Sequence, residues 1–517
     1  MKMKFNILPI AITAVLGAGM SSCNDWLRVD MEDKVMEKTM FSDYKGYCTA
    51  LNGIYIGMNG LYSNQLSTGA IDVMAQYYNV TENNSHSKRL YAGYKYNDPS
   101  IKTSIENIWQ TLYNLIANTN VVIEHTETGD VLNEKQRGII RGEAFALRAF
   151  LHFDLLRLFG PIYSTSPDQV CIPYQESSQR VIQPLLPASE VLGKIINDLK
   201  EAESLLSQYD PIITEGVGNI LTNDDGVSTY DTSFRQLRLN YYAVEAMLAR
   251  AYLWKGDKTE AYKYAKTNVI DRVTTEDLEV FPWVTLSQID AEGKNDYLFS
   301  SEVIFSLYNS KRVDNVLRAN FISTLTLANR LTFVGSSLSS NSKVATFYDD
   351  LGDYRRKMWS TIDPTDEEIE AAGPWGEALP TLVFNKYDEF TKDAINNSTG
   401  TVTTYRFMVP LIRLSEMYLI AAESSPNTTE ALELINTLRL HRNCRDLPAD
   451  TDIDRAITYE MAREVIGEGQ LFYFYKRRAM TEIISGTSID GKYNMQLSNY
   501  TLPLPDSEIE ERNISNL

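Results

Sequence analysis

Apolar residues recur three and four positions apart over much of the chain, which is the spacing of one face of an α-helix. The clearest run covers residues 136–159, and Gly160 and Pro161 directly after it predict where that helix ends. A second run with the same spacing covers residues 104–126. We expect these two amphipathic segments to pair as a helical hairpin.

The helical spacing continues in the next part of the chain. Residues 189–206 form a third amphipathic segment, entered through Pro187 and with Ser189 as the expected N-cap. After a long polar loop, residues 237–255 form a fourth segment of the same kind. We expect the fourth segment to pack against the third.

An internal repeat links two distant parts of the chain. Residues 249–265 align without a gap with residues 419–435, and two pairs of alanines coincide in the alignment. In the first copy, a turn at Gly256-Asp257 separates one predicted helix from another at residues 258–267. Small residues at helix crossings and paired helices are typical of tetratricopeptide repeats. The long insertions between the copies predict that helix pairs form a frame and that function lies on the insertions.

The pattern changes between residues 280 and 406. Residues 300–309 and 379–387 are rich in β-branched and aromatic side chains and predict short strands. Residues 336–342 and 371–376 are rich in Ser, Gly and Pro and predict loops. Taken together, the chain is predicted to be mostly α-helical, with tetratricopeptide-type helix pairs and an irregular half that contains short strands.

The start of the chain has the features of a secretion signal. Two lysines lie among the first four residues, and an apolar run over residues 5–20 is too short to cross a bilayer comfortably. The Ser-Ser-Cys that follows resembles a bacterial lipobox, although Met20 stands where Leu is usual. We therefore expect residues 1–22 to be removed and Cys23 to carry an acyl anchor. In the alternative, the serines mark an ordinary cleavage site and Cys23 is incidental.

Composition narrows the class of partner. The chain has 517 residues, of which 44% are hydrophobic and 23% charged, as in globular proteins. It has 49 basic and 68 acidic side chains, a net charge of −19, which makes nucleic acid and anionic lipid surfaces poor partners for its body. The cysteines after Cys23 have no disulfide framework or zinc-ligand spacing. The 31 Tyr and 6 Trp suit core packing and sugar stacking equally well.

Six segments in order resemble the SusD/RagB family of Bacteroidetes outer-membrane lipoproteins. No single segment is decisive, because arginine-alanine helices are common, but their order along the chain is specific. The chain departs from the family pattern at residues 468–478 (EGQLFYFYKRR), where a Glu-Gly-His-Arg-like run and a Phe-Asp pair are usual. That departure leaves the ligand class open. The matching segments are residues 41–62, 141–163, 239–257, 410–424, 431–439 and 502–516.

The resemblance implies a fold, a location and partners. It implies four tetratricopeptide-like helix pairs and an irregular half, within a single domain over residues 23–517. The helical scaffold is expected at about 41–270 and 410–480, and a ligand-facing insertion at about 280–406. The family implies a lipid-anchored protein on the outside of the outer membrane, seated like a lid on a SusC-type TonB-dependent transporter. The ligand is usually an oligosaccharide, and a peptide in some members.

Candidate ligand contacts lie in segments that lack a helical apolar face. Aromatic rings that lie parallel to sugar rings, with amide groups nearby, are the chemistry that glycan capture needs. In the alternative, these rings pack the loops onto the frame, as we expect for Trp109 and Trp254 in the helical repeats. The candidates are Tyr77, Tyr78, Asn79 and Tyr91 in residues 74–98, and Trp283, Trp359 and Trp375 in the insertion.

Catalytic chemistry finds little support. The chain has four His and no HExxH, GxSxG, phosphate-binding GxxxxGK or dinucleotide-binding glycine motif, and His152 is interpreted as structural. Acidic residues at 363–370 and 223–226 could hold calcium, but neither segment has the spacing of an EF-hand. We interpret them as solvated acidic residues and expect neither a metal nor another cofactor. Glycan capture, peptide capture and, less favoured, a surface hydrolase are the competing hypotheses.

Overall fold

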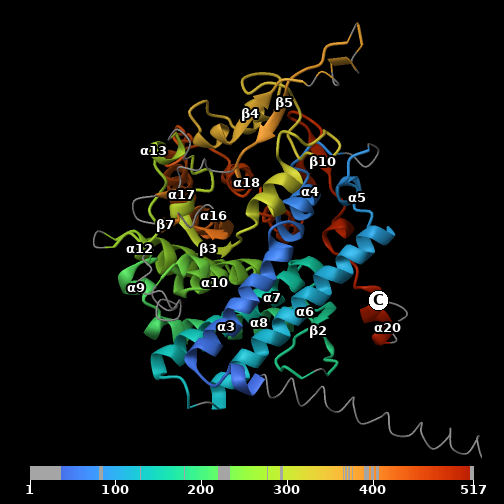
Figure 1. Cartoon of the computed structure of the whole chain (residues 1–517). Coiled ribbons are helices and arrows are strands. Elements are labelled where there is room, and N and C mark those ends of the chain that lie inside the picture. The colour runs from blue at the N-terminus through green and yellow to red at the C-terminus, as the bar shows by residue number, and fades with distance from the viewer. Residues whose placement is uncertain are drawn as a thin grey trace, which may run out of the picture.

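The fold is mostly helical, as predicted (Figure 1). The computed structural model describes residues 37–512 apart from 81–84, 129, 180, 219–232, 276–277, 291–294, 365, 367–368, 371–372, 375, 389–394, 397–400 and 403–406. The longer helices are α3 (Tyr44–Tyr62), α6 (Pro99–Thr128), α7 (Glu134–Phe159), α8 (Ala188–Tyr209), α10 (Tyr241–Lys255), α16 (Leu414–Ser424), α17 (Thr428–Leu440) and α18 (Ile453–Glu464). The shorter helices are α4 (Ile71–Met74), α5 (Arg89–Ala92), α9 (Ile212–Glu215), α11 (Lys258–Tyr262), α12 (Asp271–Val273), α13 (Leu286–Ile289), α14 (Lys343–Phe347), α19 (Leu471–Arg477) and α20 (Asp506–Glu511).

The predicted hairpin of residues 104–126 and 136–159 is confirmed as α6 packed against α7. Helix α7 begins at a capping box, in which the Asn133 side chain accepts from the Gln136 N–H and the Gln136 side chain accepts from the Asn133 N–H. It ends at Gly160, as the sequence predicted. Helix α6 extends beyond the predicted segment at both ends, and its additional N-terminal turn buries Ile101.

The next two helices also pack together, but two details of their starts were wrong. Ser189 does not cap α8, since Pro187 occupies the cap position and the Ser189 hydroxyl donates to Asp168 Oδ1 at 3.1 Å. Helix α10 begins at Tyr241 rather than at residue 237, because the Asn240 side chain accepts from the Ala243 N–H and fixes the first turn there. Residues just upstream form a short 3₁₀ turn, Arg235–Leu237.

The internal repeat is confirmed in detail by α10–α11 and α16–α17. The aligned residues Asp257 and Asn427 both act as N-caps, each accepting a backbone N–H three residues later. Ala251 and its counterpart Ala421 are fully buried, where α10, α11 and α16 pack together. The helix predicted at 258–267 continues past α11 as a π-helical turn, Lys263–Ile270.

Five pairs of antiparallel strands complete the described fold. The strands predicted at residues 300–309 and 379–387 are confirmed as β3 (Val303–Tyr308) and β5 (Thr381–Phe384). Strand β3 pairs with β8 (Met408–Arg413), which opens the second scaffold segment where the sequence predicted helix. The remaining strands are β1 (Val170–Pro173), β2 (Leu185–Pro187), β4 (Trp359–Ile362), β6 (Ile395–Asn396), β7 (Thr401–Val402), β9 (Glu482–Ile484) and β10 (Lys492–Asn494).

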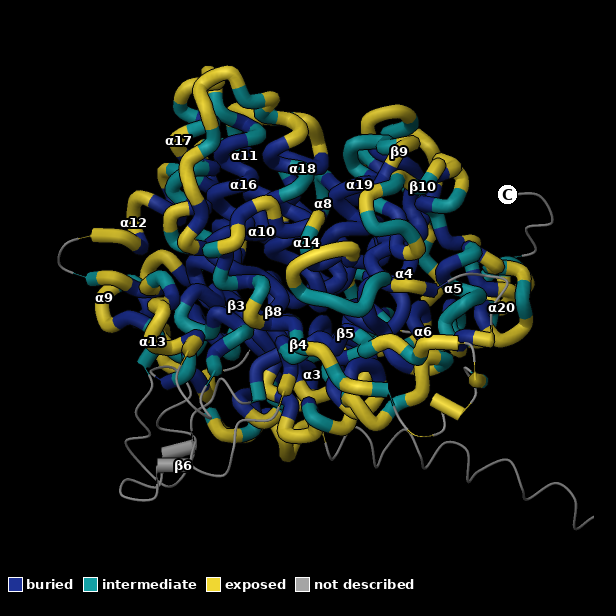
Figure 2. The backbone as a smooth tube through the Cα atoms, turned by 90° about the horizontal axis from the view of Figure 1, so that it is seen from above, coloured by how far each residue is buried: buried dark blue, intermediate teal, exposed yellow. Residues whose placement is uncertain are grey.

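One continuous hydrophobic core runs from Phe41 to Leu502 and joins the helical and irregular parts. Figure 2 shows buried backbone through the centre of both parts and exposed backbone mainly at the periphery. The irregular part is therefore a packed layer and not a set of free loops. This arrangement decides which aromatic side chains can meet a ligand.

A buried ionic cluster ties the insertion to the C-terminal helices. The Glu464 carboxylate on α18 accepts from Arg355 and Arg442 at 2.9 and 2.8 Å on one oxygen, and from Arg413 at 2.9 Å on the other. Each of these side chains is at most 1% exposed. Burial opposes ionisation, but Arg442, Arg413 and Arg355 outweigh it and hold the pKa of Glu464 well below its ordinary value.

The pKa of the neighbouring Glu460 predicts how the free energy of unfolding changes in acid. Burial opposes its ionisation, yet Arg355, Arg463 and Arg439 lower the pKa of Glu460 from 4.5 to about 2. A carboxyl group with a lowered pKa in the folded state stabilises that state above its unfolded pKa, and this stabilisation is lost as pH falls toward the folded pKa. We expect the free energy of unfolding to fall between pH 4.5 and 2, by about 3 kcal/mol from this group alone. Urea unfolding followed by circular dichroism at several pH values measures this free energy. A free energy of unfolding that stays constant between pH 4.5 and 2 would contradict the prediction.

Candidate functional site

Tyr77 and Tyr78 lie in the core and present no ring face to solvent. Tyr77 has no exposed surface and its hydroxyl donates to the Ala462 carbonyl at 2.6 Å. Tyr78 is 1% exposed, and its ring centroid lies 5.9 Å from that of Phe321. In this conformation both rings pack the loop onto the helical frame, which was the alternative to ligand contact.

Trp359 is the first residue of β4 and is also part of the core. It is 3% exposed, its ring centroid lies 4.1 Å from that of Phe333, and its indole N–H donates to the Tyr348 hydroxyl at 3.3 Å. Through Phe333 and Phe347, this ring belongs to the same aromatic cluster as Tyr77. The sequence placed Trp359 in a ligand-facing loop, but the pairing of β4 with β5 turns it inward.

Replacing Trp359 by Ala should therefore lower the free energy of unfolding by about 3–5 kcal/mol, since it removes a large buried ring. Urea unfolding followed by far-ultraviolet circular dichroism measures the loss. The matched control is Trp283→Ala, which removes the same side chain from a half-buried site and should cost less. Equal, small losses for both variants would show that Trp359 is not packed as described.

The other candidates are not among the rings of this cluster. Trp283 is half-buried, with its ring parallel to the His441 ring at a centroid distance of 4.3 Å. Tyr91 on α5 is half-buried and its hydroxyl donates to Ser104 Oγ on α6 at 2.6 Å. Asn79 is exposed and its backbone N–H donates to the Thr332 carbonyl. Ligand contact by these three stays a prediction, and Trp375 and Cys23 lie outside the described residues.

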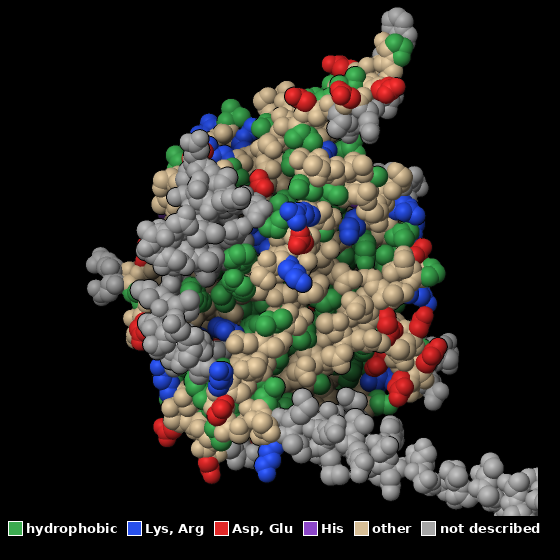
Figure 3. Space-filling model, in the orientation of Figure 1, with side chains coloured by type: hydrophobic (Ala, Val, Ile, Leu, Met, Phe, Trp, Pro, Cys, Tyr) green, Lys and Arg blue, Asp and Glu red, His purple; other side chains and the backbone are tan. Residues whose placement is uncertain are grey.

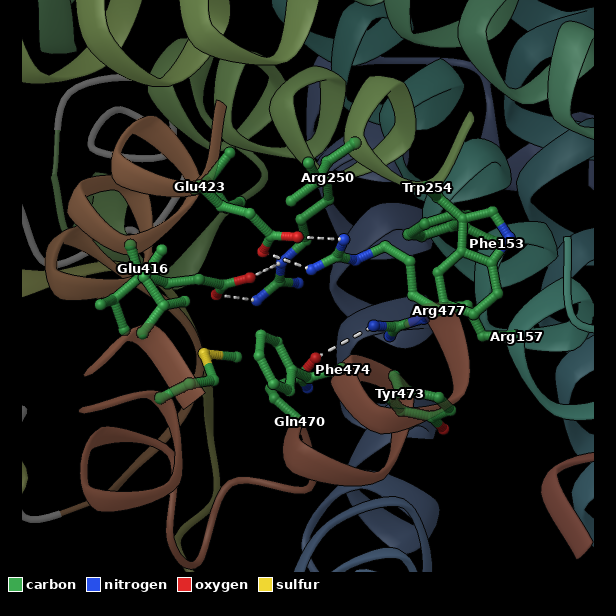
Figure 4. A pocket seen from close by; sticks show the side chains of 15 residues that line it. Phe153, Arg157, Arg250, Trp254, Glu416, Glu423, Gln470, Tyr473, Phe474 and Arg477 are labelled. Atoms are coloured by element: carbon green, nitrogen blue, oxygen red, sulfur yellow. Dashed lines mark hydrogen bonds and ion pairs between the residues drawn. The ribbon is translucent and has the colours of Figure 1, made fainter. Parts of the chain in front are cut away.

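One cavity near the repeats is too small for a sugar. It lies between α7, α10, α16, α18 and α19 and measures about 50 Å³. Figure 4 shows Arg250 paired with Glu416 and Arg477 paired with Glu423 on one side of it, and Phe153 and Trp254 on the other. A water needs about 10–15 Å³ and ligand pockets measure about 300–1,000 Å³. The cavity therefore has room for a few waters only.

Two of the wider surface grooves that border α18 share lining residues and have the size of ligand sites. One measures about 440 Å³ and lies between α18 and the β9–β10 hairpin; we call it the hairpin groove. The other measures about 360 Å³ and lies between α18 and the insertion residues Thr346 and Asp349; we call it the insertion groove. Tyr459 and Arg455 line both grooves. This site was not predicted from the sequence, because the α18 segment was interpreted only as scaffold.

His152 is structural, as the sequence indicated. It is fully buried, its Nδ1 lies 2.9 Å from the Arg148 carbonyl and its Nε2 accepts the Gln175 N–H at 3.0 Å. Burial lowers the pKa of His152 to about 3, so the ring is neutral and its two nitrogens are occupied. Such a ring is fixed in one tautomer and is not available to move a proton.

Four further features of the described residues concern cysteines, metal binding, membrane spanning and surface charge. Cys48, Cys171 and Cys444 are each buried. Within the described ranges, no three His, Cys, Asp or Glu side chains meet as they would around a metal ion; residues 223–226 and part of 363–370 lie outside those ranges. No described helix combines the length and the apolar character needed to cross a bilayer. On the face drawn in Figure 3, basic and acidic side chains lie interspersed.

Comparison with known proteins agrees with this fold. Residues 25–213 match the SusD-like_3 family model, described as starch-binding and associating with the outer membrane. SusD-like protein P2 of Formosa agariphila is 24% identical over 443 residues, which cover 78% of each chain.

Solved structures extend the likeness to nearly the whole chain. A SusD superfamily protein of Bacteroides thetaiotaomicron has a TM-score of 0.65 at 20% identity, covering 90% of this chain and 98% of its own. A SusD-like carbohydrate binding protein of Bacteroides vulgatus has a TM-score of 0.65 at 17% identity, covering 92% and 97%. The fold is thus a helical scaffold of tetratricopeptide type shared with these structures. The chain is thus similar to SusD-like proteins, over residues 25–213 by the family model and over 90% of its length in fold.

Proposed function

We propose that this protein is a lipid-anchored glycan-binding protein of the outer cell surface, which captures an oligosaccharide and delivers it to a SusC-type TonB-dependent transporter. It acts by binding and has no catalytic role. The single observation that carries the proposal is the match of residues 25–213 to a family described as starch-binding and associating with the outer membrane. The ligand-sized grooves beside α18 are consistent with it.

Binding measurements on the purified mature chain test the proposal. Isothermal titration against maltoheptaose, cellohexaose, xylohexaose and a set of oligopeptides should show binding of at least one oligosaccharide, with no cleavage products detected by chromatography. Binding of oligopeptides alone would support the alternative, a peptide-binding member of the family. Release of shorter sugars from any oligosaccharide would instead indicate a surface hydrolase. Trp283→Ala and Tyr91→Ala test whether these half-buried rings contact the ligand.

Delivery to a transporter needs a separate test in cells. Pull-down of the protein from detergent-solubilised outer membranes should recover a large TonB-dependent barrel. Such a barrel encoded beside this gene would support the pairing. Recovery of the protein free of any barrel would contradict the delivery step but not glycan capture.

Replacing Cys23 by Ala should release the protein from membranes. The physical reason is that each buried methylene of an acyl chain contributes about 0.8 kcal/mol, so the anchor and not the acidic body holds the protein on the bilayer. Fractionation of cells followed by immunoblotting measures the shift from membrane to soluble fractions. Cys48→Ala is the matched control, because this cysteine is buried in the core. Membrane attachment that persists without Cys23 would contradict the anchor.

A further inference from the structure

The side chain of Tyr459 stands between the hairpin groove and the insertion groove. It is half-buried on α18, and Asp454, Arg455 and Thr458 from the same helix line the hairpin groove beside it. Within the described part of the chain, its hydroxyl has no hydrogen-bond partner. A flat ring with a free hydroxyl at the boundary of two open grooves is suited to stacking on a sugar ring.

Two arginines border this ring along the helix. Arg455 lies one turn before Tyr459 and Arg463 one turn after it, with guanidinium carbons 5.6 and 5.7 Å from the ring centroid. Arg463 is 4% exposed and held by Glu460 at 2.7 Å, so it supports the ring from the core side. Arg455 is exposed and makes no ion pair among the described residues. Its planar group can therefore donate to the hydroxyl groups of a bound sugar.

Asp452 caps α18 and makes no ion pair among the described residues, but the other charged groups of the grooves neutralise one another. In the hairpin groove, Arg478 pairs with Asp454 at 2.9 Å and Lys492 pairs with Glu482 at 2.8 Å. In the insertion groove, Asp349 lies 3.3 Å from Arg439 and 3.2 Å from Arg463. Paired groups hold their geometry but offer no excess positive charge to an anionic ligand. The net charge of −19 on the chain also disfavours anions.

We infer that the hairpin and insertion grooves form one binding site for a neutral oligosaccharide, with Tyr459 as its stacking ring and Arg455 as a hydrogen-bond donor. This inference rests on the proposed function and names the ligand chemistry and the site. The grooves measure about 440 and 360 Å³, so an oligosaccharide can place successive rings on either side of Tyr459. Peptide capture is less favoured, because among the described residues the rim leaves only Arg455 and Asp452 without an ion pair for the termini and side chains of a peptide.

Titration of purified variants tests this site. The probes are maltoheptaose, cellohexaose and xylohexaose as neutral oligosaccharides, with oligogalacturonate as an anionic one and oligopeptides as a further class. Tyr459→Ala should lower the affinity for the neutral oligosaccharide that the wild type binds best at least tenfold. Tyr459→Phe keeps the ring and should keep most of this affinity. Arg455→Ala should weaken binding severalfold. Tyr308→Ala is the matched control, because Tyr308 is 43% exposed and lines neither groove.

The outcomes separate this inference from the proposed function. Loss of affinity in Tyr459→Ala with an unchanged melting temperature supports the site. Unchanged affinity in both Tyr459→Ala and Arg455→Ala overturns the site but leaves glycan capture in place. Binding of oligogalacturonate or oligopeptides in preference to every neutral sugar overturns the ligand chemistry. A wild-type chain that binds no oligosaccharide overturns the proposed function and the inference together.

Discussion

Replacing Glu464 by Ala should unfold the protein or leave it close to unfolding at room temperature. This carboxylate is shared by Arg355, Arg413 and Arg442, and the backbone carbonyl of Glu464 accepts a further bond from Arg413. Removing one partner of a buried ion pair costs about 3–5 kcal/mol, because the remaining charges stay buried without compensation. That cost is a large part of the roughly 5–15 kcal/mol that stabilises a domain. Urea unfolding or, for an insoluble product, the soluble yield measures the effect.

Two comparison variants separate charge from packing. Glu464→Gln keeps the shape and one acceptor oxygen, so it should fall between the wild type and the Ala variant. Glu482→Ala removes an exposed carboxylate from its 2.8 Å pair with Lys492, and surface pairs contribute only about 0–1 kcal/mol. A Glu464→Ala protein as stable as Glu482→Ala would mean that the cluster is not the link between insertion and helices that its geometry indicates.

The contacts of Glu464 also show why local sequence patterns could predict only part of the fold. The helices follow from spacing that repeats every three or four residues, and the repeat alignment even gives the caps Asp257 and Asn427 at equivalent positions. The arginines around Glu464 come from 22 to 109 residues away along the chain. Strand β8 was missed for the same reason, since its partner β3 lies about a hundred positions earlier.

The aromatic candidates show why the ligand-binding residues were harder to predict from the sequence than the helices. The lack of a helical apolar face around Tyr77 and the charged neighbours of Trp359 indicated irregular segments, but composition does not say which side of such a segment faces the core. Tyr77 is held by the carbonyl of Ala462, which is 385 residues distant. A long-range contact of this kind leaves no local signature. By contrast, the spacing of Arg455, Tyr459 and Arg463 is visible in the sequence and could have marked α18 as more than scaffold.

Replacing Gly469 by Ala should strongly destabilise the protein. Gly469 has a φ of +71°, and a Cβ there would lie 2.3 Å from the Leu66 carbonyl oxygen and 2.6 Å from the Ser67 Cα. Both obstacles are backbone atoms and cannot turn aside. The Gly469 N–H also donates to Asp72 Oδ1 at 3.0 Å, so a shift of this loop weakens the attachment of the N-terminal part. We expect a loss of more than about 3 kcal/mol in urea unfolding.

Gly467 provides a control within the same loop. Its φ is +83° and its N–H donates to the other oxygen of Asp72, but a Cβ there would meet only side-chain atoms, at 3.2 Å or more. Gly467→Ala should therefore cost about 1–2 kcal/mol, the ordinary penalty of a left-handed backbone for a residue with a Cβ. Gly193→Ala in α8 meets nothing within 4 Å and should stabilise the helix by about 0.5–1 kcal/mol. If Gly467→Ala and Gly469→Ala lose equal stability, backbone conformation alone sets the cost, and the close approach of Leu66 and Ser67 to Gly469 does not exist in solution.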